Sequence, residues 1–153
     1  MDIPEALSGI SAYSSIQNLS LVGLKGLRLY LRRSKTAEQS ERMKHDLSTF
    51  RERFCNVIAS ISENSSEAML ANVSVFKGIN QLYEGKKDDL AKLSKQFTIL
   101  KSLIDQMLEG RPVSKKDIEP HLPRLVELSQ QASRHFRRAE SEEFFLGQAS
   151  MTR

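Results

Sequence analysis

Cysteine, tryptophan and proline are scarce in this chain of 153 residues, which contains one cysteine, no tryptophan and four prolines. The single cysteine, Cys55, excludes an internal disulfide and any metal site that needs several thiolates. A reducing compartment is therefore expected, with export of a disulfide-free protein as the alternative. Cys55 is expected to be a small buried hydrophobe, because a reactive thiol needs a nearby cation, for which Arg51 is the candidate.

Long apolar runs are absent as well. No stretch approaches the ~18 apolar residues that a membrane-spanning helix needs. The first residues carry Asp2 and Glu5 where a secretory signal has Lys or Arg. The sequence therefore predicts a soluble, cytoplasmic protein, with secretion without a cleaved signal peptide as the alternative.

Charge of one sign is not concentrated in any part of the chain. The 23 Lys and Arg residues exceed the 19 Asp and Glu residues by four, and the excess is spread along the sequence. A nucleic-acid-binding module usually gathers its basic residues on one face. Nucleic-acid binding is therefore only a second alternative for the function.

Catalytic and metal-binding signatures are also absent. His45, His121 and His135 lie on separate predicted elements, and none follows a carboxylate at the Glu-x-x-His spacing of a di-metal bundle. There is no His-Glu-x-x-His, no phosphate-binding glycine loop and no Gly-x-Ser-x-Gly turn. The sequence therefore predicts no enzyme activity, no cofactor and no metal, and His135 is expected to be structural.

A heptad pattern over 66–109 dominates what the sequence does contain. Apolar residues seven apart, with a second set three positions later, predict one long helix or two collinear ones packed lengthwise. The two sets are Met69, Phe76, Tyr83, Leu90, Phe97 and Ile104, and Ile79, Leu93, Leu100 and Met107. The unbroken spacing favours continuity over a break near Gly85, and Gly110 with Pro112 is expected to end the helix.

A second heptad pattern predicts a helix over 37–62. Thr36 and Gln39 have the spacing of a capping box, which marks its start. The apolar positions alternate four and three apart: Met43, Leu47, Phe50, Phe54, Val57 and Ile61. Turn-forming residues over 62–66 should reverse the chain, so that this helix lies antiparallel to 66–109.

Residues 19–33 form the least regular predicted helix. Leucines occur all round it, Gly23 and Gly26 lie inside it, and its cations are Lys25, Arg28, Arg32 and Arg33. A helix that is apolar on all sides is usually buried, so this one is expected in the core. The alternative is a cationic segment that inserts at a membrane surface.

The last helix, which is expected to begin at Pro123 and end at Gly147, carries the candidate partner-binding residues. They are a basic strip and an apolar cluster: Arg134, Arg137 and Arg138, and Phe144, Phe145 and Leu146. Exposed aromatic residues near a chain end are effective anchors in a partner's groove. Docking of the cluster back onto the bundle is the alternative.

Together these patterns predict an all-α, antiparallel bundle of about four main helices built on a long coiled-coil-like hairpin. With 39% hydrophobic and 27% charged residues, one domain over 1–153 is expected, with 1–33 as a semi-independent segment and 148–153 as a frayed tail. The expected function is a non-enzymatic protein–protein interaction or assembly module, which binds a protein partner or itself as a homo-oligomer. A membrane-acting protein using 19–33 is the first alternative.

Overall fold

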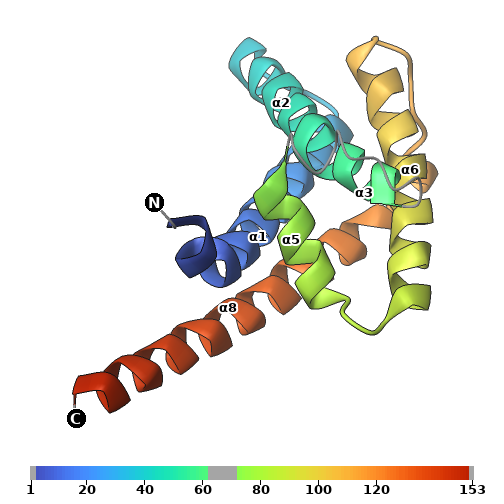
Figure 1. Cartoon of the computed structure of the whole chain (residues 1–153). Coiled ribbons are helices and arrows are strands. Elements are labelled where there is room, and N and C mark those ends of the chain that lie inside the picture. Colours follow the sequence, from blue (N-terminus) through green and yellow to red (C-terminus); the bar gives the residue numbers. More distant parts are fainter. Residues whose placement is uncertain (1–2, 62–71, 152–153) are drawn as a thin grey trace.

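The computed structural model of the chain describes residues 3–61 and 72–151, together with their side chains except those of 3–10, 144, 145 and 147–151. Within these ranges all regular structure is helical, which confirms the all-α prediction (Figure 1). The elements are α1 (Ile3–Leu31), α2 (Ala37–Phe50), the π-helical turn η1 (Arg51–Cys55), α3 (Asn56–Ile61), α5 (Val73–Leu82), α6 (Lys87–Leu108), α7 (Lys115–Ile118) and α8 (His121–Met151). The turn predicted over 62–66 and the seam residue Met69 lie outside the described residues.

The first helix, α1, lies at the centre of the fold, which differs from the predicted arrangement around 37–62 and 66–109. The three most extensive contacts between described helices join α1 to α8, α2 and α5. Its buried side chains form one broad face of the helix: Ala12, Ile16, Leu19, Ser20, Leu24 and Leu27. The leucines of 19–33 that lie in the core are therefore covered by other helices of the same chain.

The helix predicted over 37–62 is continuous through α2, η1 and α3. Its start is the expected capping box, in which the Gln39 backbone N–H donates to the Thr36 hydroxyl and the Thr36 N–H donates to the Gln39 side chain. Four of its six seam positions are buried in the core: Leu47, Phe50, Phe54 and Val57. Met43 and Ile61 pack against that core from its edge.

The pairing of this helix with α6 is antiparallel. Phe54 stacks edge-on against Phe97 with ring centroids 5.2 Å apart, and the Ser94 hydroxyl donates to the Ile58 carbonyl at 2.6 Å. Residue numbers therefore rise along one helix as they fall along the other. The buried apolar positions of α6 all belong to the predicted heptad: Leu93, Phe97, Leu100, Ile104 and Met107.

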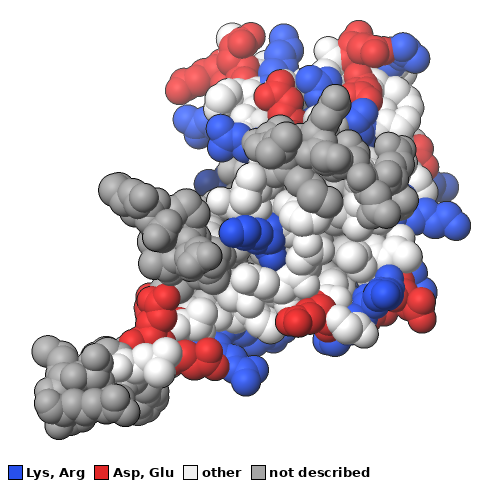
Figure 2. Space-filling view, viewed as in Figure 1, with Lys and Arg blue, Asp and Glu red and all other residues white. Residues whose placement is uncertain are grey.

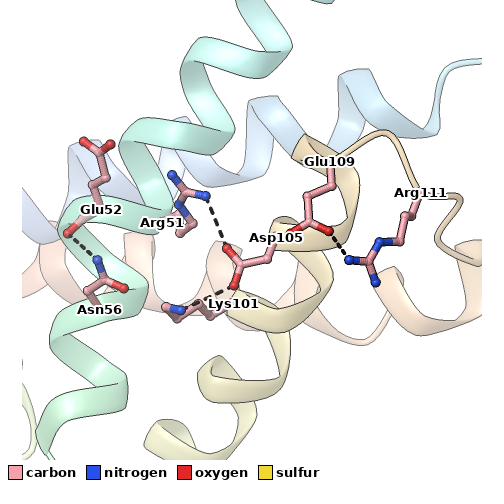
Figure 3. A network of polar contacts seen from close by, with 7 residues as sticks. All are labelled: Arg51, Glu52, Asn56, Lys101, Asp105, Glu109 and Arg111. Carbon is pink, nitrogen blue, oxygen red and sulfur yellow. Dashed lines mark hydrogen bonds and ion pairs between the residues drawn. The ribbon is translucent and has the colours of Figure 1, made fainter.

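An ion-pair network ties the same two helices together near the surface (Figure 3). Asp105 of α6 accepts from Arg51 of η1 at 3.3 Å and from Lys101, one turn away on its own helix, at 3.4 Å. These side chains are about one-third exposed, so solvent screening limits the network to a modest contribution. It fixes the register of η1 on α6 more than it stabilises the fold.

The prediction of a continuous helix over 66–109 is wrong. The chain leaves α5 at Leu82 and starts α6 at Lys87, and Gly85 in the turn has a positive φ of 76°. That conformation is readily accessible to glycine and costs other residues about 1–2 kcal/mol. The break lets α5 pack across α1 while α6 packs against α3.

The last part of the chain agrees with the prediction at its start and differs at its end. Gly110 ends α6 with a φ of 80°, and the Ser114 hydroxyl accepts from the Lys116 N–H at the start of α7. The helix α8 begins two residues before Pro123 and continues through Gly147 to Met151. Residues 148–151, which were expected to be frayed, are therefore helical, and 152–153 lie outside the described residues.

Glycines allow α1 its central position. A Cβ at Gly23 would lie 2.5 Å from the Phe50 ring, and a Cβ at Gly78 of α5 would lie 2.6 Å from the Ala12 carbonyl oxygen. Both helices can approach α1 this closely only because no side chain intervenes. A single apolar core results, to which each described helix contributes.

Candidate functional site

A groove between α1 and α2 is lined by basic side chains. The two helices run antiparallel, because Gly23 meets Phe50 and Gly26 meets Leu47. The groove encloses about 720 Å³. Its lining comprises Val22, Lys25, Arg28 and Leu29 from α1, Arg32 directly after it, and Gln39, Arg42, His45 and Asp46 from α2. We refer to this cavity as the basic groove.

Each part of the basic groove has its own chemistry. One rim is formed by Lys25 and Arg28 of α1 and by Arg32, which directly follows the last residue of that helix. Arg42 and His45 form the opposite rim on α2. Between the rims, the half-buried side chains of two apolar residues, Val22 and Leu29, provide an apolar floor.

Among the described residues, the four cations of the basic groove have no carboxylate partner. Lys25, Arg28, Arg32 and Arg42 are exposed, and none forms an ion pair with another described residue. Asp46 is the single carboxylate in the lining and likewise forms no ion pair with the described residues. The groove therefore carries an uncompensated positive charge above an apolar floor, which suits a ligand that is both acidic and apolar.

A second, more polar pocket of about 490 Å³ lies where the α5–α6 turn faces α8. Lys86, Lys92, Arg124 and Arg134 line it together with Asp89 and Glu127. Arg124 is paired with Glu127 at 3.5 Å, so part of its charge is already compensated. Because two carboxylates line this pocket beside its four cations, its net charge is +2, against +3 for the basic groove with its single carboxylate.

Two aromatic groups belong to the surroundings of this pocket. Burial raises the pKa of the Tyr83 phenol, and Arg124 opposes that rise. His135 lines the pocket and packs its ring against Tyr13 of α1, with centroids 5.4 Å apart. The ring contact supports the structural role predicted for His135.

The described side chains of the predicted partner-binding residues lie in different surroundings. Arg134 lines the polar pocket, Arg137 is exposed, and Arg138 pairs with Glu142 at 3.4 Å. Leu146 is 71% exposed, whereas the side chains of Phe144 and Phe145 lie outside the description.

The C-terminal end of α8 projects beyond the other helices (Figure 1). Acidic side chains flank it where it leaves the rest of the molecule (Figure 2). Glu140, Glu142 and Glu143 are all exposed, and Leu146 follows them on the same helix. The end therefore combines exposed carboxylates with an exposed apolar residue.

Burial of the remaining nucleophilic and titratable groups argues against chemistry at those positions. Cys55 is fully buried, and burial raises the pKa of its thiol well above the ordinary value even though Lys101 opposes the shift. His121 is 8% exposed, and burial lowers its pKa from the ordinary value. Within the described part of the chain, no group of three or more His, Cys, Asp or Glu residues could hold a metal ion.

Among the helices of residues 3–61 and 72–151, none is both long enough and apolar enough to cross a membrane. No protein-family model, curated protein or solved structure matches this chain.

Sequence patterns identified only part of the basic groove. Lys25, Arg28 and Arg32 stand out as the cations of a leucine-rich helix, but Arg42 and His45 are ordinary polar positions of the next helix. Their convergence depends on the antiparallel packing of α1 on α2, for which Gly23 and Gly26 are the only local signals.

Proposed function

We propose that this protein is a non-enzymatic protein-interaction module that binds an acidic, amphipathic helix in the basic groove. The observation that carries the proposal is the row of exposed, unpaired cations above an apolar floor. A helix that docks in a groove uses apolar residues at helical spacing as anchors. Carboxylates flanking those anchors would complement the two rims.

The helical framework supports this proposal. We take α1, the 37–61 helix, α6 and α8 as the four main helices, with the antiparallel pairing of 37–61 and α6 as the coiled-coil-like part. The α2 residues that line the groove, Arg42, His45 and Asp46, are not seam residues. The seam residues Leu47 and Phe50 are already packed against α1. A partner could therefore occupy the groove without opening the core.

Electrostatic attraction across such an interface should raise the association rate and depend on ionic strength. Exposed charges about 10 Å or more apart are largely screened at physiological salt, so close approach to the rims decides the affinity. The apolar floor provides the salt-insensitive part of the binding free energy.

The test is a titration of the full chain with a fluorescent, designed amphipathic peptide that carries Glu beside Leu anchors, followed by anisotropy. Substitution of the four groove cations by Gln should weaken binding about tenfold or more. The groove variant is Lys25→Gln, Arg28→Gln, Arg32→Gln and Arg42→Gln. Higher salt should weaken wild-type binding, and a peptide with Lys in place of Glu should not bind.

A matched control removes four exposed cations that lie outside the groove and have no ion pair with the described residues. This control is Arg53→Gln, Lys87→Gln, Lys95→Gln and Lys116→Gln. Its affinity should stay within about twofold of wild type. Equal losses in the two variants would show that net charge alone drives binding. Tighter groove-dependent binding of a DNA duplex or of anionic vesicles would favour those partners instead.

A further inference from the structure

The acidic end of α8 has the chemistry that the basic groove requires. We define this acidic end as residues 140–146, which contain three exposed carboxylates, Glu140, Glu142 and Glu143, and end at the exposed Leu146. The groove has four cations and one carboxylate in its lining, so its net charge of +3 is matched by the three carboxylates. Phe144 and Phe145, which precede Leu146 in the sequence, make the segment apolar as well as acidic.

We propose that the basic groove of one molecule binds the acidic end of α8 from a second copy of this chain. This inference rests on the proposed function and names the partner. It also gives a role to Leu146, whose exposed apolar side chain would otherwise remain in water.

The spacings of the two charged sets agree. Glu140 and Glu143 are three residues apart on α8, as are Lys25 and Arg28 on α1. Each pair therefore rises about 4.5 Å along its helix. A helix laid along the groove can place successive carboxylates opposite successive cations of the α1 rim. The turn between the two glutamates carries Glu142, which in the single chain pairs with Arg138 of its own helix.

The acidic end cannot occupy the groove of its own molecule. Figure 1 shows the C-terminal end of α8 and the α1–α2 connection at opposite ends of the fold. The part of α8 before the acidic end is held against α1 through contacts such as the one between His135 and Tyr13. A second copy is therefore required.

Such an interface joins two different surfaces and leaves one free groove and one free acidic end on a pair of molecules. Heterologous contacts of this kind form rings when the rotation closes and open chains when it does not. The groove is shallow and the charges are exposed, so association is expected to be weak, at micromolar concentrations, and sensitive to salt.

The test is sedimentation velocity of the full chain over a range of concentrations, with two charge-reversed variants. The groove-reversed variant is Arg28→Glu with Arg42→Glu, and the end-reversed variant is Glu140→Lys with Glu143→Lys. Each alone places like charges at the interface and should sediment as the 17.4 kDa monomer. All four positions are exposed, so circular dichroism melts should resemble those of the wild type.

An equimolar mixture of the two variants should restore association. The reversed groove then faces the reversed end, and the native groove of one variant faces the native end of the other. A wild-type chain that stays a monomer at every concentration would overturn the self-association, as would association that persists in either single variant. The proposed function is tested separately, because a monomer can still bind the designed acidic peptide through the groove.

Discussion

Gly23 of α1 lies directly beneath the ring of Phe50 of α2, so closely that a Cβ at Gly23 would be 2.5 Å from a ring carbon. The ring cannot easily move away, because Phe50 is fully buried and stacks on Phe54 with centroids 5.2 Å apart. This contact sets the distance between the two helices that form the basic groove. The absence of a side chain at Gly23 therefore allows both the close packing of the core and the formation of the basic groove.

Replacement of Gly23 should therefore destabilise the protein. Gly23→Ala is expected to lower the free energy of unfolding by about 1–3 kcal/mol, as overpacking in a close-packed core does. The measurement is a urea melt beside Asn18→Ala, a change at an exposed position of the same helix. An alanine at Gly23 that is as stable as the wild type would show that α1 and α2 lie farther apart than described.

The packing of α6 against the 37–61 helix gives a second prediction. Leu100 is fully buried, and Leu100→Ala should remove about 2–5 kcal/mol from the free energy of unfolding. Lys95 is exposed on the same helix, and Lys95→Ala should stay within about 0.5 kcal/mol of the wild type. Similar small losses for both changes would mean that the α6 seam is not buried.

Two glycines outside the core should respond to alanine in opposite directions. Gly85 has a φ of 76° in the α5–α6 turn, so Gly85→Ala should cost about 1–2 kcal/mol. Gly147 lies within α8, where alanine is the better helix former by up to about 1 kcal/mol. Thermal melts of the two variants should shift to opposite sides of the wild-type midpoint. A stabilising effect of Gly85→Ala would contradict the break between α5 and α6.

Protonation of His121 should destabilise the fold in mildly acidic solution. Burial lowers the pKa of His121 below its ordinary value of 6.5, so the unfolded chain binds this proton more readily than the folded chain does. The stability associated with neutral His121 is therefore present above about pH 6.5 and is lost as the pH falls towards the lowered pKa.

The measurement is the free energy of unfolding at about pH 5 and pH 7.5 for wild type and His121→Gln. Because Gln does not titrate, the variant should lose less stability than the wild type on acidification. Parallel losses in the two proteins would assign the acid sensitivity to other groups.

The amphipathic helices were the predictable part of the fold. The heptad positions of 37–62 and of α6, such as Phe54 and Phe97, are buried because each helix has one stripe to cover, and a regular stripe is visible in the sequence. The capping box at Thr36 is equally local. By contrast, the leucines of α1 occur all round the helix and mark no single stripe in the sequence, so its central position does not follow from periodicity.

The break at Gly85 was obscured by an uninterrupted spacing. Phe76, Tyr83 and Leu90 are seven residues apart and all half-buried, although they belong to α5, the turn and α6. When both helices bury an apolar stripe, the seven-residue spacing of the apolar positions can continue through the turn between them. The end of α8 was placed too early because Gly147 stays helical, and one glycine costs a helix only about 1 kcal/mol.

The basic groove was beyond sequence analysis because its two rims come from different helices. Arg28 and Arg42 meet across a groove only after α1 and α2 pack antiparallel. The candidate strip of Arg134, Arg137 and Arg138 was instead divided between a pocket, solvent and an ion pair on its own helix.

The most direct test of binding in the basic groove is an NMR titration of the ¹⁵N-labelled full chain with the designed acidic peptide. The account predicts that the largest changes in amide chemical shift occur in two segments. These are 22–32, which covers the end of α1 and Arg32, and 39–46 of α2. The changes should vanish when Lys25, Arg28, Arg32 and Arg42 are replaced by Gln. Changes centred on the polar pocket around Tyr83 and Arg134, or no changes at all at millimolar peptide, would contradict it.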